Sequence, residues 1–300
     1  MVAIGCRKLA IQRDSDGAWS LGHSCSDATI SSMLSVRTIL RREGVELADV
    51  VCRHPRGRGQ ATEYTNGHVL VFVRRGCFVR RANGVETLLD ATVAYCMNAG
   101  DEQRYDHPHD HGDECTSLHF DADVLASVWG GDAILPADAL ALSPRIDLEH
   151  RLLVVAARNG ADSHELVERA IALTARALEG ADPRRVASGR PSTARARRAL
   201  VDGVRETLAT RPETSLRDLA GALAVSPHHL SRTFSASTGH TIARHRMHLR
   251  VRNVLNRLAD GERDLARVAA DVGFADHSHL CRVVRSETGH TPSALRRALA

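Results

Sequence analysis

The feature that most limits the possible folds is a repeat in the last third of the chain. Two four-residue motifs each occur twice, at a spacing of 50 residues. The pairs are His229–Arg232 with His279–Arg282, and Thr238–Thr241 with Thr288–Thr291. Upstream, Leu219 and Leu223 match Val268 and Val272 at a spacing of 49. The second copy therefore has one additional residue, which we place in its turn because loops accept insertions.

Each copy has the pattern of a short helix, a turn and a second helix. Apolar residues at i, i+3, i+4 and i+7 predict a first helix with one buried face. They are Leu216, Leu219, Ala220 and Leu223 in the first copy, and Leu265, Val268, Ala269 and Val272 in the second. In the first copy Ser215 and Ser226 are the expected N-caps, and Pro227 is expected to open the second helix. In the second copy the turn contains Gly273, and Asp276 is the expected N-cap.

The segment between the copies, residues 241–258, contains no Gly or Pro and carries apolar residues among many Arg. This pattern predicts one long connecting helix. At about 1.5 Å per residue, 18 helical residues span roughly 27 Å, and the flanking units extend the reach toward the ~34–36 Å of one DNA turn. We therefore expect one chain to contact two successive major grooves and to bind an asymmetric site.

The charge of the chain is divided unevenly. Residues 184–300 contain 21 Arg and 10 Asp plus Glu, a net charge of +11, which leaves −7 for residues 1–183. A compact basic domain attracts polyanions and accelerates encounter with nucleic acids. The alternative is a soluble basic domain that binds no polyanion, so the charge alone does not decide between the two.

The exposed face expected for each second helix fits the major groove of DNA. Small polar side chains allow close approach, and an arginine can donate two hydrogen bonds to O6 and N7 of guanine. In the second copy the candidates are His277, Ser278, Cys281 and Arg282. For Arg232 and Arg282 the alternatives are contact with a phosphate or an internal ion pair.

The basic part resembles the AraC/XylS family of bacterial transcription regulators over about residues 195–297. Most of the resemblance lies in residues 273–282 and 289–292. The chain departs from the family pattern at Leu280 and Val284, where Phe is usual, and at Arg285, where Lys is usual. The resemblance implies two helix-turn-helix units joined by a long helix. The positions that correspond to DNA-binding residues are His228, Ser231, Arg232, His277, Ser278, Cys281 and Arg282.

Residues 45–120 have the pattern of a β domain. Short apolar or alternating runs at 69–73, 77–80 and 115–120 are separated by turn sequences such as Asn66-Gly67 and Asn83-Gly84. We expect a small antiparallel barrel here, so the chain is predicted to have an α+β fold with an all-α C-terminal domain. The family resemblance implies a cupin-like β-barrel that binds a small effector or mediates dimerisation.

Residues 106–115 are rich in side chains that bind metals. They include His107, His109, His111 and Cys115, with His119 further along. Imidazole, carboxylate and thiol groups can bind Zn²⁺ or Ni²⁺. However, alternation along a loop does not direct three imidazoles at one point. We therefore favour a polar turn between strands over a metal or effector sensor, and we predict no metal, no cofactor and no catalytic residue.

Two amphipathic helices are predicted after residue 147. Their apolar stripes fall within 148–156 and 166–178, separated by Asn159-Gly160. The stripes exceed what one pair of helices needs to bury. The excess can be covered by a second copy of the chain, which would make a homodimer, or by the barrel, and the sequence leaves both open.

Cysteine usage and hydropathy bear on the compartment. The seven Cys are scattered and form no C-x-x-C pair, which argues against a disulfide framework or a thiolate zinc cage. No stretch approaches the roughly 18 apolar residues of a spanning helix. We therefore expect a cytoplasmic protein with no membrane partner.

These observations divide the chain into five predicted segments. Residues 1–32 have no assigned role, 33–144 form the cupin-like effector domain, 145–180 the helical dimerisation or packing segment, 181–193 a linker, and 194–300 the DNA-binding domain. We predict a sequence-specific transcription regulator that binds double-stranded DNA, responds to a small-molecule effector, contacts RNA polymerase and forms a homodimer. The alternative is a metal-binding cupin sensor or enzyme tethered to DNA.

Overall fold

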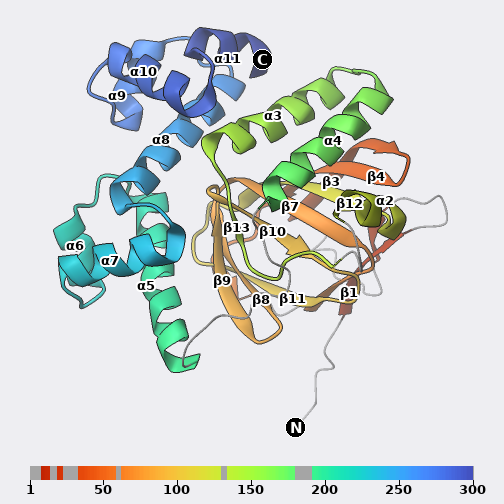
Figure 1. Cartoon of the computed structure of the whole chain (residues 1–300), viewed down its shortest axis with the longest axis horizontal. Coiled ribbons are helices and arrows are strands. Elements are labelled where there is room, and N and C mark those ends of the chain that lie inside the picture. Colours follow the sequence, from red (N-terminus) through yellow and green to blue (C-terminus); the bar gives the residue numbers. More distant parts are fainter. Residues whose placement is uncertain are drawn as a thin grey trace. The chain divides into compact units, whose positions relative to one another are not determined.

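The computed structural model describes residues 8–13, 19–22, 33–58, 62–129, 134–179 and 191–299. Most of the segment 1–32, and residues 181–190 of the predicted linker, lie outside these ranges. The chain forms two compact units (Figure 1). The first contains the described residues within 1–89, 93–140 and 160–184, and the second those within 90–92, 141–159 and 185–300. Among the described helices, none is long and apolar enough to cross a membrane.

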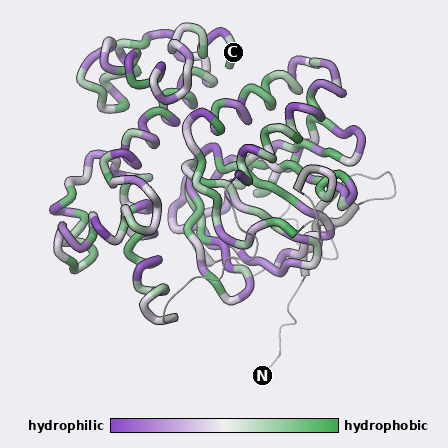
Figure 2. Tube along the Cα trace, in the orientation of Figure 1, coloured by the Kyte–Doolittle hydropathy of each residue, from purple (hydrophilic) through white to green (hydrophobic). Residues whose placement is uncertain are grey.

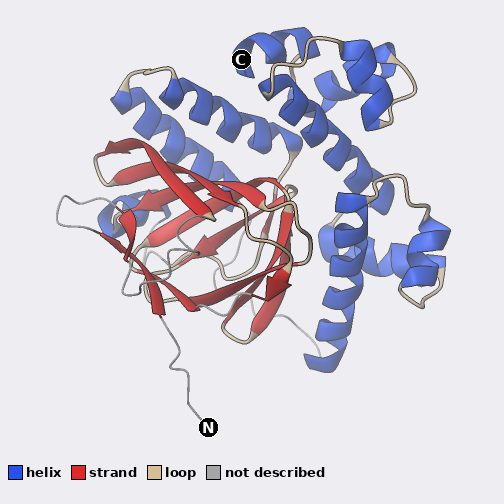
Figure 3. Cartoon of the chain, turned by 180° about the vertical axis from the view of Figure 1, so that it is seen from behind, coloured by secondary structure: helices blue, strands red, loops and turns tan. Residues whose placement is uncertain are grey.

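The first unit is built on two β-sheets, whose strands are red in Figure 3. One sheet has the order β2 (Trp19–Gly22), β1 (Lys8–Arg13), β6 (Thr62–Thr65), β11 (Glu102–His107), β8 (Cys77–Ala82) and β9 (Val85–Asp90), with β5 (Gly57–Arg58) also paired to β11. The other has the order β13 (Leu140–Ala141), β10 (Val93–Met97), β7 (His68–Arg75), β12 (Asp113–Phe120), β4 (Val45–Cys52) and β3 (Leu34–Arg42). The predicted α+β fold class and the predicted strands within 45–120 are confirmed.

The predicted β domain is confirmed, but its described strands form two sheets that do not close into one barrel. The described strand pairs within residues 45–120 are antiparallel as predicted, and β1, which precedes this region, pairs with β6 in parallel. The physical reason is visible in the burial of β7 and β10, which are buried at nearly every position instead of alternating. Strands of this kind are covered on both faces, as in a layered arrangement.

Apolar side chains from both sheets form one core between them. Val69, Val71 and Val73 of β7 pack with Phe78 and Leu89 from the opposite sheet. Helix α4 (Ser163–Leu178) packs on β3, and α2 (Ala122–Trp129) packs on α4. The hydropathy along the chain follows this division, with hydrophobic stretches in the strands and mixed patterns along the helices (Figure 2).

The second unit is helical in its described parts. Its helices are α3 (Pro144–Arg158), α5 (Pro191–Thr210), α6 (Leu216–Ala222), α7 (Pro227–Thr238), α8 (Ile242–Ala259), α9 (Leu265–Val272), α10 (His277–Thr288) and α11 (Pro292–Leu299). The predicted connecting helix is confirmed as α8, which begins after the N-cap Thr241. It lies between α6–α7 at one end and α9–α11 at the other (Figure 1).

The predicted helical segment 145–180 is divided between the two units. Helix α3 packs against α8, α10 and α11 of the second unit, whereas α4 packs on β3 of the first. The apolar side chains of both helices are buried or half-buried within the chain, among them Leu148 of α3 and Leu173 of α4. The excess of apolar surface that led us to expect a dimer is therefore covered within the chain, and dimerisation itself stays a prediction.

Candidate nucleic-acid interface

The first helix-turn-helix unit consists of α6 and α7, and its ends are capped as its sequence predicts. The Ser215 hydroxyl accepts a hydrogen bond from the backbone N–H of Asp218 at 3.1 Å, and the Ser226 hydroxyl accepts one from His229 at 3.2 Å. Pro227 occupies the first turn of α7. Such caps satisfy backbone donors that the first turn of a helix leaves free.

One face of α7 is fixed in the core of this unit. Leu230 and Phe234 are fully buried and pack with Leu219 and Ala220 of α6 and with Val204 of α5. Because these anchors lie on one side of the helix, the residues between them face outward. The orientation of α7 in the unit is therefore determined by packing and leaves a polar face exposed.

The second helix-turn-helix unit, α9 and α10, repeats this arrangement. A carboxylate oxygen of Asp276 accepts a hydrogen bond from the backbone N–H of His279 at 2.6 Å, which confirms the predicted N-cap. Leu280 and Val284, where the family pattern has Phe, are both fully buried in the core formed with α8, α11 and α3. These two departures therefore concern the core and not the exposed face.

The turns of the two units differ in one residue type and one insertion. Gly273 ends α9 in the left-handed region with φ +84°, and the equivalent residue of the first unit, Ala224, has φ +54°. The turn that follows Gly273 has one more residue before its N-cap than the turn that follows Ala224. The insertion predicted from the change of spacing lies in this second turn.

All seven predicted DNA-binding residues lie on the exposed or half-exposed surface of α7 and α10. His228, Arg232, His277, Ser278 and Arg282 are exposed, and Ser231 and Cys281 are half-buried beside them. Arg232 and Arg282 are each the sixth residue of their helix. This places the two guanidinium groups at equivalent positions of the two units.

The guanidinium groups of Arg232 and Arg282 form no hydrogen bond or ion pair with any described residue. The internal ion pair that the sequence left open is therefore absent from the described part of the chain. An exposed arginine with free donors, held on a packed helix, is suited to contact a base edge or a phosphate.

The thiol of Cys281 lies next to the ring of His277, with Sγ 3.5 Å from Nε2. Burial raises the pKa of this thiol above its usual value. The group is therefore neutral near pH 7, and a neutral thiol is not repelled by phosphate. The two side chains lie next to Arg282 in the sequence and on the same helix.

Several arginines of α8 have structural partners that the charge count could not reveal. Arg244 forms an ion pair with Glu287 of α10 at 3.0 Å, and Arg246 donates a hydrogen bond to the backbone oxygen of Thr214 at 2.6 Å. Arg250 lies against Gly273. Some of the arginines of α8 therefore bind the two helix-turn-helix units to this helix and are not available to a ligand.

The helical compact unit also contains a buried ionic cluster that the sequence did not predict. The Asp147 carboxylate of α3 is fully buried and lies 3.1 Å from Nε of Arg151 and 3.8 Å from Nε of Arg252 on α8. Burial raises the pKa of Asp147, but the charges of Arg151 and Arg252 outweigh it and lower the pKa below its usual value. The carboxylate is therefore ionised and pairs with two cations.

The His-rich segment lies between β11 and β12. Residues 108–112 form the turn that joins the two strands, as the sequence predicts. His109 and His111 lie in the turn itself, His107 ends β11, and Cys115 and His119 lie within β12. The five side chains therefore do not converge on a single point.

Comparisons with known proteins gave one family model and several solved structures. A family model described as a helix-turn-helix domain matches residues 219–298. No protein of curated function matches the chain. A solved structure of ToxT from Vibrio cholerae O395 is 14% identical and covers 86% of this chain and 99% of its own, with a TM-score of 0.35. ToxT bound to (E)-4-(8-methylnaphthalen-1-yl)but-3-enoic acid is 15% identical and covers 89% and 100%, with a TM-score of 0.33.

A third solved structure covers a smaller share of the chain. It is a transcriptional regulator from Chromobacterium violaceum, described as an AraC-type DNA-binding domain-containing protein. It is 22% identical and covers 36% of this chain and 96% of its own, with a TM-score of 0.33.

The two capped units, the connecting helix and the family match define a DNA-binding domain with two helix-turn-helix units. The match identifies residues 219–298 as a helix-turn-helix domain, the part of the chain that can bind DNA.

Proposed function

We propose that this regulator recognises an asymmetric DNA sequence by placing α7 and α10 in successive major grooves. The observation that carries the proposal is the pair Arg232 and Arg282, exposed, without partners among the described residues, and at the same position of two equivalent helices. An arginine in this setting donates two hydrogen bonds to guanine, worth about 1–3 kcal/mol of discrimination against other bases. His228, Ser231, His277, Ser278 and Cys281 complete the two proposed base-contacting faces.

The two faces differ in composition, which supports an asymmetric site. At the position before the arginine, Ser231 of α7 corresponds to Cys281 of α10, and His228 corresponds to Ser278. A hydroxyl donates and accepts hydrogen bonds, whereas a thiol does both weakly. The two half-sites should therefore share a guanine contact and differ at the neighbouring base pairs.

The experiment is selection of bound duplexes from a random pool by wild-type protein and by two variants, Arg232→Ala and Arg282→Ala. We expect each variant to lose base preference in a different half of the selected sequence and to bind the wild-type site about 1–3 kcal/mol more weakly. Arg297→Ala is the matched control, because this arginine is also exposed and unpaired in the described chain but lies on α11. It should weaken all sequences slightly and leave the preference intact.

The proposal is contradicted if all three variants select the wild-type sequence and lose affinity equally for cognate and random duplexes. That outcome would assign Arg232 and Arg282 to phosphate contacts, which carry no sequence information directly. The salt dependence of binding also distinguishes base contacts from phosphate contacts, because each lost phosphate contact lowers the slope of log K against log salt by about 1.

The second part of the proposal concerns control by the first unit. The core between its two sheets contains polar side chains among apolar ones. Arg80 and Gln103 are buried and joined by a hydrogen bond, and the hydroxyls of Tyr95 and Tyr105 lie 3.4 Å apart. A few polar groups in an otherwise apolar interior are typical of small-molecule sites. We propose that a small effector binds here and alters DNA binding, with no catalytic step.

The remaining partners are proposals of the same kind. A homodimer and a contact with RNA polymerase fit a regulator of this type that acts on DNA in the cytoplasm. Light scattering at micromolar concentration, with and without the selected duplex, tests the dimer, and a monomer under both conditions would exclude it.

A further inference from the structure

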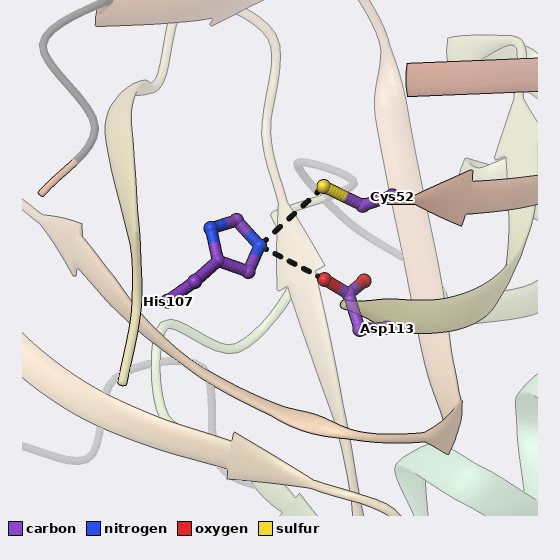
Figure 4. Close-up of side chains that lie close together, drawn as sticks. All are labelled: Cys52, His107 and Asp113. Carbon is purple, nitrogen blue, oxygen red and sulfur yellow. Dashed lines mark hydrogen bonds and ion pairs between the residues drawn. The ribbon is translucent and has the colours of Figure 1, made fainter. Parts of the chain in front are cut away.

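Three metal-binding side chains from distant parts of the sequence lie together in the first unit (Figure 4). Cys52 is the last residue of β4, His107 the last of β11, and Asp113 the first of β12. One potential ligand atom from each lies within 4.8 Å of the other two. Within the described residues, no other group of three or more His, Cys, Asp or Glu side chains meets this condition.

The backbone holds the three residues in place. Cys52 and Asp113 are directly paired across the antiparallel strands β4 and β12, so their side chains lie on the same face of one sheet. His107 comes from the other sheet. The turn between β11 and β12 lies tightly on β4, because a Cβ at Gly112 would overlap the carbonyl oxygen of Cys52. Gly112 also has φ +63°, which a residue with a side chain rarely adopts.

The distances between the ligand atoms fit a tetrahedral metal ion. Nε2 of His107 lies 3.0 Å from a carboxylate oxygen of Asp113 and 3.4 Å from Sγ of Cys52. With Zn–S of about 2.3 Å and Zn–N and Zn–O of about 2.0–2.2 Å, the edges of a tetrahedral site are about 3.3–3.6 Å long. The two distances from Nε2 therefore lie within a few tenths of an ångström of these edges. The third distance, between Sγ and the carboxylate oxygen, is at most 4.8 Å.

One hydrogen on Nε2 of His107 can be shared between the Asp113 carboxylate and the Cys52 sulfur, so hydrogen bonding already holds the three groups together. A cation at the centre would take the place of this hydrogen and bind the lone pairs of all three atoms at once.

The surroundings support binding of an ion. The Cys115 thiol donates to the second carboxylate oxygen of Asp113 at 3.5 Å, which orients the first oxygen toward His107. The ring centroid of Phe78 lies 6.2 Å from that of His107, and the ring of His54 stacks on His107 with a centroid distance of 5.7 Å. Groups that hold a ligand in position raise metal affinity, and apolar neighbours weaken competition from water.

We propose that Cys52, His107 and Asp113 bind a Zn²⁺ ion in the first unit. A thiolate and an imidazole favour zinc over the harder Mg²⁺ and Ca²⁺, which prefer oxygen ligands. Three protein ligands leave a fourth position for water or a small molecule. The side chains keep a small exposed fraction, 7–9%, through which an ion and a further ligand can reach them. This site is independent of the DNA-binding proposal.

The experiment titrates the metal-stripped full-length protein with Co²⁺ and then displaces Co²⁺ with Zn²⁺. We expect one Co²⁺ per chain, with a near-ultraviolet band from thiolate coordination and visible bands typical of a tetrahedral ion, and complete displacement by Zn²⁺. Cys52→Ser should abolish the thiolate band. His107→Ala and Asp113→Ala should each weaken Zn²⁺ binding by more than about 100-fold, beyond the effect of losing a group that only orients a ligand.

Matched variants test the assignment of ligands. Cys96→Ser removes another buried thiol and should leave the thiolate band unchanged, and His111→Ala removes an exposed imidazole from the adjacent turn without effect. Cys115→Ser should weaken binding by about 10-fold and retain the band. A variant that fails to fold is replaced by the corresponding Cys52→Ala or His107→Gln variant. The proposal is overturned if Co²⁺ binds without a thiolate band, if the band survives in Cys52→Ser, or if wild-type protein binds no Zn²⁺ at micromolar concentration.

Discussion

Replacing Asp147 by Ala should destabilise the DNA-binding unit severely, although this residue lies outside the predicted DNA-binding domain. The side chains of Asp147 and Arg252 are 0% and 1% exposed, and Nε of Arg252 lies 3.8 Å from the carboxylate. Arg151 makes a second, closer contact of 3.1 Å. Removing the carboxylate would break both of these ion pairs while the two guanidinium groups stay buried.

The expected cost follows from the geometry. Breaking a buried ion pair by removing one partner costs about 3–5 kcal/mol, because the remaining charge stays buried. Total stabilities of about 5–15 kcal/mol are usual for domains, so a large part of the margin would be lost. Arg145→Ala on the same helix is the matched control. The Arg145 side chain is 75% exposed, and its 3.8 Å pair with Glu149 contributes less than about 1 kcal/mol.

Hydrogen exchange measured by mass spectrometry, combined with urea unfolding, can locate the effect. Peptides from α8, α10 and α11 should lose protection in Asp147→Ala, while Arg145→Ala should match wild type. Adding Arg252→Met to Asp147→Ala should recover part of the loss, because an apolar side chain of similar length removes the unpaired charge. A loss below about 1 kcal/mol in Asp147→Ala, or no recovery on adding Arg252→Met, would refute the reasoning.

Two further predictions concern the helical compact unit, residues 141–159 and 185–300: one the turns of its helix-turn-helix units, the other its pH dependence. Ala224→Gly should stabilise this compact unit by about 1 kcal/mol, because Ala224 has φ +54° and glycine adopts this region without strain. Gly273→Ala should destabilise it for the same reason, and thermal unfolding of both variants checks that the two effects have opposite signs. Burial lowers the pKa of His245 to about 4, so the folded state favours the neutral ring. Its contribution to stability is complete above the unfolded pKa of about 6.5 and falls by about 1 kcal/mol by pH 5.5. Unfolding at pH 7.5 and 5.5 should show a weaker pH dependence in His245→Gln than in wild type, and equal dependence would contradict the assignment.

The parts of the fold that depend on neighbouring residues could be predicted from the sequence. The caps at Ser215, Ser226 and Asp276 were correct because a cap bonds to a backbone group three residues away. The single connecting helix was correct because 18 residues without Gly or Pro give a helical pattern little alternative. These interactions are local, so the pattern of residue types is sufficient to specify them.

The features that sequence analysis missed depend on contacts between distant residues. Arg151 and Asn256 are joined by a hydrogen bond across 105 positions, and Cys52 lies beside His107 across 55. A thiol at position 52 has no local pattern that marks it as a metal ligand. It becomes a proposed ligand only through the register of β4 against β12, which places it opposite Asp113. The His-rich segment drew attention to the correct turn, but it contributes one imidazole to the group rather than three.

Helix α3 belongs to the DNA-binding unit, although it lies far from that unit's other helices in the sequence. Leu148 and Asp147 of α3 lie in the core and the ionic cluster around the second helix-turn-helix unit. The buried pairing of Asp147 with Arg252 fixes α3 on α8, because moving α3 alone would separate two buried charges. A DNA-binding fragment that begins at residue 194 should therefore be less stable than one that also contains α3.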